Sequence, residues 1–218
     1  MKYLAERIQG PILYQTVEEN YVFSASEYNA MNRVNAFRPN VGLDKSMVSD
    51  TDVLENEGFS DIKAYILKHI NVYAEEILQV TKDVEFYISS SWISAYEPGI
   101  GQAPNYHHNS VFTGSLCISE EGAPINFNDG RSSLFPGIDF PYVTIPHAKS
   151  EHEAGKLSLW PSKIAYMINP YKSVVEMRAA SSALLESRRL FFNVWFKGSL
   201  GHTGINAPFN VTSRLKTQ

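Results

Sequence analysis

A series of short β-type segments beginning near residue 85 is the strongest constraint on how this chain folds. These segments are rich in β-branched and aromatic residues and are separated by Gly, Pro and Asn. This spacing favours a β-sandwich, jelly roll or barrel over a parallel α/β fold. The expected strands lie in "VEFYISSSWISAYEPG", "VFTGSLCISEEG", "APINFND", "KLSLWPSKIAYMINPY" and "RRLFFNVWFKGSLG". The fourth segment reads as two short strands hinged at Pro161.

One amphipathic helix is predicted before these strands. Between residues 61 and 79, side chains recur at helical spacing at Ile62, Tyr65, Ile66, His69, Tyr73, Ile77 and Leu78. We expect this helix to pack on a sheet, with His69 as a hydrogen-bonded histidine on its buried or border face. Upstream, "GPILYQTVEEN" predicts an edge strand, and the polar residues between 35 and 58 predict a loop.

The chain therefore divides into four parts. Residues 1–60 form a strand and loop segment, with an arm that reaches a neighbouring molecule as the alternative. Residues 61–84 form the packing helix and its connection. Residues 85–201 form the β core, with a long loop at 128–154, and residues 202–218 form a tail.

Composition narrows the possible partners. The net charge of -4 gives no electrostatic reason to expect binding to nucleic acid or to an anionic membrane. Cys117 is the single cysteine, which excludes an internal disulfide, and we expect it to be a buried strand residue. The charged N-terminal residues and the absence of a long apolar run predict a soluble, cytoplasmic protein.

Several motifs follow one another along the predicted strands. "GIGQ" precedes "NYHHNS", a Thr-Gly pair follows in the next strand, and "GKLSLWPS" and "FFNVWFKGSLG" come later. Their order resembles a family of 2-oxoglutarate/Fe(II)-dependent oxygenases found in bacteria and phages. Chains of that family read approximately G-x-x-Q, H-x-H-P-N-S, S-G, G-x-L-x-x-F-P-S-x-L-x-H and R-x-S-x-x-F-N. The resemblance implies a double-stranded β-helix, a jelly roll of two packed sheets with a site between them.

The resemblance also implies a particular chemistry. Such enzymes hold Fe(II) with three side chains, typically two His and a carboxylate, and leave positions open for 2-oxoglutarate and oxygen. Two ligands lie at positions i and i+2 of a strand, on one side, and the third comes from a distant strand. An Arg farther along binds the far carboxylate of 2-oxoglutarate, because a guanidinium suits planar two-point contacts.

When the family positions are carried over, most of the metal ligands are lost. The two neighbouring ligand positions fall on Asn105 and His107, and the distal position falls on Tyr166. An amide oxygen is a much poorer Fe(II) ligand than a carboxylate, and a phenol ionises only near pH ~10. We therefore expect no cofactor, and a small hydrogen-bonded network of these three residues where the iron would lie.

The 2-oxoglutarate position falls on Ser187, which cannot supply a guanidinium. Arg188 and Arg189 lie beside it, and only Arg189 shares the strand face of Ser187. If the chain were active, these two arginines would be the residues that hold 2-oxoglutarate.

Other ligand sets remain open. Asn109 could pair with His107 in an H-x-N arrangement, and the long loop could bring His147 or His152 over the site. The simpler interpretation makes these loop histidines solvated, turns His108 away from His107, and places His202 in a turn. The tryptophans Trp92, Trp160 and Trp195 are expected to fill the space between the sheets.

The sequence thus predicts a non-catalytic jelly roll that serves as a structural or binding module. Its partners would be proteins, in a homo-oligomer or a larger assembly such as a phage particle. The aromatic residues Phe135, Phe140 and Tyr142 in "SSLFPGIDFPYV" are the expected contact surface. The alternative is an active Fe(II)/2-oxoglutarate-dependent dioxygenase with an unusual ligand set. A sugar-binding jelly roll that uses the aromatic loop ranks lower, because the sequence has no calcium-type carboxylate cluster.

Overall fold

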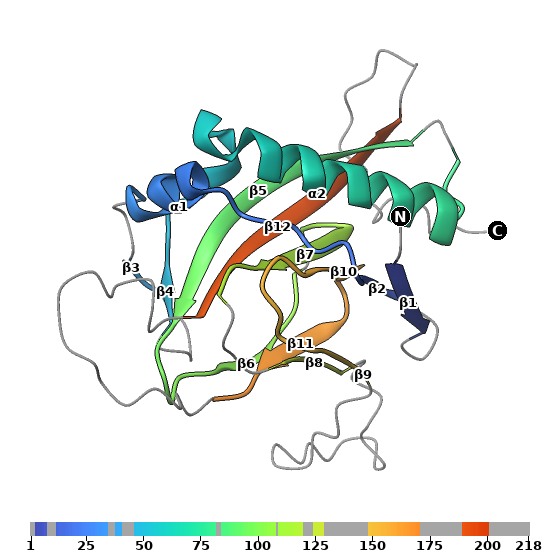
Figure 1. Cartoon of the computed structure of the whole chain (residues 1–218). Coiled ribbons are helices and arrows are strands. Elements are labelled where there is room, and N and C mark those ends of the chain that lie inside the picture. The colour runs from blue at the N-terminus through green and yellow to red at the C-terminus, as the bar shows by residue number, and fades with distance from the viewer. Residues whose placement is uncertain are drawn as a thin grey trace, which may run out of the picture.

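The protein folds into two antiparallel β-sheets with one long helix packed across the larger sheet (Figure 1). The computed structural model describes residues 3–7, 12–34, 38–40, 46–81, 84–107, 109–119, 124–128, 148–170 and 189–200. Within these ranges, strands outnumber helices, so the predicted mainly β class is confirmed.

The larger sheet contains eight strands, all paired antiparallel. Their order is β1 (Tyr3–Arg7), β2 (Ile12–Thr16), β10 (Leu157–Pro161), β7 (Phe112–Cys117), β12 (Arg189–Leu200), β5 (Val84–Tyr96), β4 (Met47–Val48) and β3 (Arg38–Pro39). The smaller sheet has the order β6 (Gln102–Asn105), β11 (Ala165–Ile168), β8 (Ile125–Asn128) and β9 (Ala148–Ser150).

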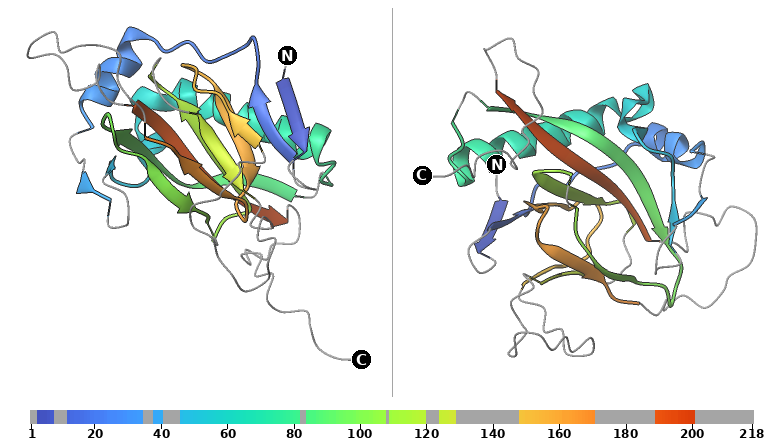
Figure 2. Two further views of the ribbon diagram at one scale, coloured as in Figure 1. Left: turned by 90° about the horizontal axis from the view of Figure 1, so that it is seen from below. Right: turned by 180° about the vertical axis from the view of Figure 1, so that it is seen from behind.

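From β5 onward the chain passes back and forth between the two sheets, which is the winding of a double-stranded β-helix. Strands β5, β7, β10 and β12 belong to the larger sheet, and β6, β8, β9 and β11 belong to the smaller one. The two sheets face each other in the views of Figure 2. The predicted jelly roll is therefore confirmed, including the two strands on either side of the turn after Pro161.

The sequence did not reveal β6 and β9. Strand β6 is only four residues long, and three of its four side chains are exposed, so it carries no alternating apolar pattern. Strand β9 is three residues long and lies inside the segment expected as an irregular loop. Both strands form because partners in the smaller sheet supply their backbone hydrogen bonds.

Helix α2 (Ser60–Val72) lies across the outer face of the larger sheet and ends in a π-helical turn, η3 (Tyr73–Ile77) (Figures 1 and 2). It is preceded by α1 (Ala25–Asn32) and two short 3-10 turns, η1 (Val53–Glu55) and η2 (Glu57–Phe59). The side chains of Ile62, Ile66 and Ile70 are fully buried and form the core between helix and sheet. A second core fills the space between the sheets around Phe127 and Trp160, as predicted for Trp160.

The first sixty residues contribute to both edges of the larger sheet. Strand β2 pairs with β1 on one side and with β10 on the other, so the prediction of an edge strand there is wrong. The edge position belongs to β1, which the sequence did not reveal. The opposite edge is β3, which pairs with β4, and β4 pairs with β5; both short strands lie inside the stretch that was predicted to be a loop.

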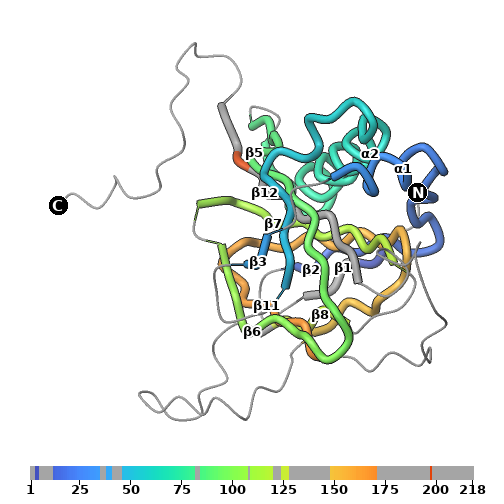
Figure 3. The backbone as a smooth tube through the Cα atoms, turned by 90° about the vertical axis from the view of Figure 1, so that its left-hand side faces the viewer, coloured from blue at the N-terminus to red at the C-terminus, as the bar shows by residue number. Residues whose placement is uncertain are grey.

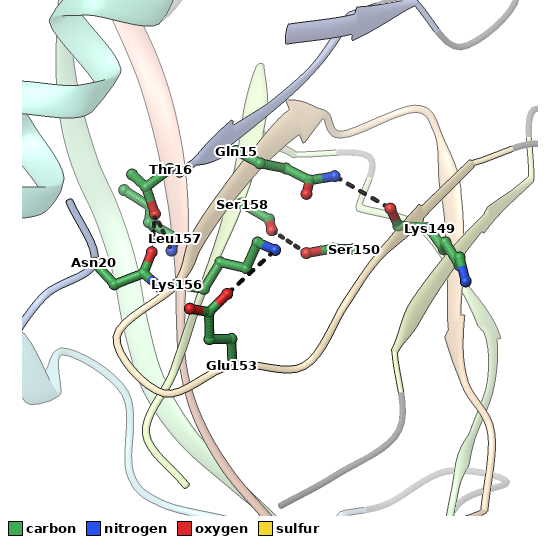
Figure 4. Close-up of polar contacts among 9 residues, drawn as sticks. All are labelled: Gln15, Thr16, Asn20, Lys149, Ser150, Glu153, Lys156, Leu157 and Ser158. Atoms are coloured by element: carbon green, nitrogen blue, oxygen red, sulfur yellow. Dashed lines mark hydrogen bonds and ion pairs between the residues drawn. The ribbon is translucent and has the colours of Figure 1, made fainter. Parts of the chain in front are cut away.

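A polar cluster joins the two sheets on the side of β2 and β9 (Figure 4). The Gln15 side chain donates to the Lys149 carbonyl at 3.2 Å, and the Ser150 and Ser158 hydroxyls lie 2.7 Å apart. The Leu157 backbone N–H donates to the Thr16 hydroxyl at 3.0 Å. Because these side chains are buried and paired, they link β9 to β2 and β10 without leaving polar atoms unsatisfied.

Cys117 is buried in β7, as predicted. Within the described ranges, no helix is both long and apolar enough to cross a membrane.

His69 packs beneath α2 against a tyrosine of the larger sheet. Its side chain is 1% exposed, and its Nδ1 lies 2.6 Å from the Tyr14 hydroxyl, so the prediction of a buried, hydrogen-bonded histidine is confirmed. Burial, with the charge of Lys68, lowers the pKa of His69 from 6.5 to about 4. Burial raises the pKa of Tyr14, so its hydroxyl keeps its proton and we assign it as the donor to Nδ1.

We predict that His69 makes the protein less stable as the pH falls from about 7 to about 4. In this range the unfolded chain binds a proton on this imidazole that the folded chain does not, so protonation favours unfolding. The stability advantage of wild type over His69→Gln should shrink by roughly 1 to 3 kcal/mol across this range. Urea unfolding at each pH measures it. Equal pH dependence for wild type and His69→Gln would contradict the assignment.

Candidate functional site

A pocket of about 370 Å3 opens where the ends of β5, β6 and β11 meet the short strands β3 and β4. Figure 3 views the molecule from the side on which β3, β5 and β6 lie. Most of the lining side chains carry a hydroxyl or an amide. The lining consists of Arg38, Asn40, Val48, Ser49, Thr51, Ser90, Trp92, Ser94, Tyr96, Gln102, Asn105, His107 and Tyr166.

Strand β5 forms one wall of the pocket through alternate residues. Ser90, Trp92, Ser94 and Tyr96 are spaced two apart and therefore lie on the same face of the strand. The residues between them point the other way, and Ile93 and Ala95 belong to the core beneath α2. One strand thus contributes both to the pocket and to the helix–sheet core.

His107 is positioned by its backbone and by two aromatic rings. Its backbone N–H donates to the Ser162 carbonyl at 3.0 Å, in the turn between β10 and β11. Its ring stands edge-on to Trp92, with centroids 6.1 Å apart. Its Nε2 lies 3.1 Å from the hydroxyl of Tyr166. This hydrogen bond joins two side chains of the pocket lining.

Tyr166 lies on β11, directly opposite Asn105 of β6 in the strand register. Its side chain is 5% exposed, and its ring packs edge-on against Trp160 at a centroid distance of 5.1 Å. Asn105, His107 and Tyr166 therefore meet in one place, as the motif alignment predicted. The side-chain oxygen of Asn105, however, accepts the backbone N–H of Tyr106 at 2.8 Å. Among these three side chains, the hydrogen bond joins His107 and Tyr166.

Ser162 fixes the segment that carries His107. Its hydroxyl lies 2.6 Å from the Ser110 hydroxyl and 2.7 Å from the Thr113 hydroxyl, and its backbone N–H donates to the Val111 carbonyl at 3.0 Å. Ser162 is 1% exposed. The Pro161-Ser162 turn, expected only as a hinge, therefore ties β11 to both sides of the histidine segment.

These residues do not suit an Fe(II) ion. Across the described ranges, no three His, Cys, Asp or Glu side chains come close enough together to hold a metal. The three positions that the family uses present one imidazole, one amide and one phenol. Fe(II) sites of this class need two imidazoles and a carboxylate, or a comparable set of strong donors. The Nε2 of His107 is also hydrogen-bonded to Tyr166.

The other proposed ligands lie elsewhere or outside the described ranges. The His152 Nε2 lies 2.8 Å from the Ser119 carbonyl oxygen, and His152 is not among the residues that line the pocket. Asn109 is exposed and does not line the pocket either. The backbone of Arg189 pairs with Tyr96. The residues whose predicted roles fall outside the described structure are His108, Phe135, Phe140, Tyr142, His147, Arg188 and His202.

Sequence reasoning missed the wall formed by β3 and β4. Arg38, Asn40, Ser49 and Thr51 line the pocket, although their segment was predicted to be a loop. No sequence pattern marks two-residue strands. Trp92 was predicted to lie between the sheets, and it lines the pocket together with residues of β6 and β11, while the side chain of Trp195 lies outside the described structure. By contrast, the β-branched and aromatic residues of β5 did predict a strand at this place in the sequence.

Comparisons with known proteins agree on the fold. No protein-family model matches the chain, and no curated protein sequence matches it. A prolyl-4-hydroxylase from Pseudomonas putida aligns with a TM-score of 0.54 at 13% identity, over 84% of this chain and 91% of that one. An oxidoreductase of the 2OG-Fe(II) oxygenase family from Burkholderia pseudomallei aligns with a TM-score of 0.52 at 8% identity, over 84% and 83%.

A third solved structure carries cofactors. The epimerase SnoN, in complex with Fe3+, alpha ketoglutarate and nogalamycin RO, aligns with a TM-score of 0.52 at 13% identity, over 83% of this chain and 76% of that one. All three likenesses are likenesses of fold. The chain therefore has the double-stranded β-helix of 2-oxoglutarate/Fe(II)-dependent oxygenases, and the resemblance in its motifs is confirmed at that level.

We predict measurable coupling between His107 and Tyr166. In a double-mutant cycle with His107→Ala and Tyr166→Phe, the interaction energy should be about 0.5 to 1.5 kcal/mol, because one intramolecular hydrogen bond contributes about that much. Urea unfolding of the four proteins measures it. The control pairs His107→Ala with Tyr14→Phe, whose hydroxyl lies beneath α2 on the other face of the sheet. Coupling no larger than in the control pair would show that the bond does not form in solution.

Proposed function

We propose that this chain is a non-catalytic member of the oxygenase fold, which uses its pocket to bind a ligand or partner instead of an iron ion. The observation that carries the proposal is the hydrogen bond between the Nε2 of His107 and the hydroxyl of Tyr166. His107 supplies the one imidazole at the three family positions, and its Nε2 faces a phenol rather than an open coordination site.

Metal binding at this place would need several changes at once. Tyr166 would have to leave His107 or ionise, although its ring is buried against Trp160. Asn105 would have to offer its amide oxygen, which already accepts a backbone N–H. An amide and a neutral phenol are both weak Fe(II) ligands, so their coordination would not offset the free energy lost in these rearrangements.

The fold does not need a metal to stay together. The two sheets and α2 bury two apolar cores on either side of the larger sheet. Apolar burial stabilises by about 25 cal/mol per Å2, so cores of this kind outweigh the contribution of one ion. A jelly roll can therefore keep its shape after the metal ligands have been replaced.

A role in an assembly fits this proposal and stays a prediction. The aromatic residues Phe135, Phe140 and Tyr142 remain the predicted contact surface, in a homo-oligomer or in a phage particle. A cytoplasmic location and the absence of nucleic-acid and membrane partners are also predictions from the sequence. The competing function is an active 2-oxoglutarate-dependent dioxygenase, and one experiment separates the two.

We predict that the protein, purified anaerobically with added Fe(II), retains far less than one iron per chain. It should also form no succinate from 2-oxoglutarate above the rate of a protein-free control, because the pocket lacks a competent ligand set. Elemental analysis and succinate quantification measure both. One iron per chain together with steady succinate formation would overturn the proposal and establish the dioxygenase.

Restoring imidazoles tests whether the family positions are correctly assigned. The double variant Asn105→His/Tyr166→His should bind Fe(II) at least about tenfold more tightly than wild type, a gain of roughly 1.4 kcal/mol. The matched control Asn109→His/Tyr166→His adds the same number of imidazoles but places one outside the pocket. Circular dichroism establishes that both variants fold. Equal iron affinity in folded samples of the two variants would show that the positions are wrongly assigned.

A further inference from the structure

We propose that the pocket binds an acidic sugar, with a carboxylate held by Arg38 and a hydroxylated ring held by the remaining lining side chains. This inference rests on the proposed non-catalytic function, because it assigns the ligand of the same pocket. It goes beyond that function in naming a chemical class and the residue that selects it.

Charge is the first observation. Among the described residues, the pocket lining includes a guanidinium and an imidazole and no carboxylate. Arg38 lies on β3 opposite Val48 of β4, and its side chain is exposed, which places the guanidinium at the mouth of the pocket. In the described part of the chain, no carboxylate forms an ion pair with Arg38. A guanidinium in this position favours a carboxylate, which it can hold through two parallel hydrogen bonds.

Arg38 is distinct from the arginine position implied by the motif resemblance. That position lies before β12, whereas Arg38 belongs to β3 at the edge of the larger sheet. The two elements are separated by β5 and β4 in the strand order. The proposed carboxylate site at Arg38 is therefore supplied by the N-terminal part of the chain.

The polar side chains indicate a ligand with many hydroxyl groups. Four lining residues carry aliphatic hydroxyls, Ser49, Thr51, Ser90 and Ser94, and three carry amides, Asn40, Gln102 and Asn105. Hydroxyls and amides both donate and accept hydrogen bonds, as sugar hydroxyls do. Several lining acceptors already take one hydrogen bond from the protein: Ser49 from the Ile93 N–H, Ser94 from the Trp92 indole and Gln102 from Tyr96. A hydroxyl or amide oxygen has a second lone pair that can accept from a sugar hydroxyl, whereas a simple dicarboxylate has no donor to offer.

The aromatic wall and the size of the pocket fit a single sugar ring. Trp92 lies in the middle of the β5 wall, and its indole N–H donates to the Ser94 hydroxyl at 3.1 Å. An indole in a pocket wall offers a broad apolar surface to the C–H face of a pyranose. The volume of about 370 Å3 lies at the lower end of ligand pockets, which span roughly 300 to 1,000 Å3. That volume suits a single ring.

Two matched pairs of sugars test the inference. Galacturonate and galactose differ only in the carboxylate at C6, as do glucuronate and glucose, and succinate offers carboxylates without a hydroxylated ring. Each is titrated by calorimetry into the full chain in buffer that contains EDTA. We expect at least one uronate to bind about tenfold or more tightly than its neutral partner and than succinate, and to weaken as salt is added.

Variants identify the residue responsible. Arg38→Gln should lower the affinity for the uronate at least about tenfold and leave weak binding of the neutral sugar unchanged. Arg33→Gln is the control, since Arg33 is also exposed but lies at the end of α1, outside the pocket lining. It should bind the uronate as wild type does. Equal losses in the two variants would overturn the role of Arg38.

The remaining outcomes are also decisive. Preferential binding of succinate, or no binding of any of the five compounds at about 10 mM, would overturn the acidic-sugar inference. Iron content and succinate formation, measured on the same protein without EDTA, test the proposed function separately. If the protein contains no iron and does not bind uronates, only the acidic-sugar inference is overturned. If it holds iron and forms succinate, the proposed function is overturned as well.

Discussion

The pairing of β6 with β11 determines which side chains meet in the pocket. This register places Tyr166 opposite Asn105, and the segment after β6 then brings His107 to the Tyr166 hydroxyl. A shift of one residue would turn every side chain of β11 to the other face of its sheet. Two independent constraints prevent such a shift: the pairing of β11 with β8 on its other side, and the hydrogen bonds of Ser162.

The same strand pairing explains how the fold can be kept while the chemistry of the pocket changes. The cores beneath α2 and between the sheets are apolar, and a polar cluster joins the sheets beside β9 (Figure 4). None of these contacts requires an ion in the pocket. The pocket wall can therefore change its chemistry, with a phenol at the distal position and a guanidinium from β3 at the mouth, while the strands that support it keep their pairing.

Sequence reasoning succeeded where a segment carries its own pattern. The long strands β5 and β12 and the helix α2 show β-type or helical spacing, and the motif order placed Asn105, His107 and Tyr166 correctly together. It failed for β3, β4, β6 and β9, which have two to four residues each and form because neighbouring strands pair with them. Arg38 was missed for this reason, since its place in the pocket depends on the pairing of β3 with β4 rather than on local sequence.

The most direct test of this account is a crystal structure of the protein soaked with Mn(II) and 2-oxoglutarate, with anomalous data collected at the manganese edge. We predict no anomalous peak in the pocket, and a Tyr166 hydroxyl that still lies within hydrogen-bonding distance of His107 Nε2. A strong peak within coordination distance of that nitrogen, with Tyr166 displaced and two further side chains bound to the ion, would contradict the account.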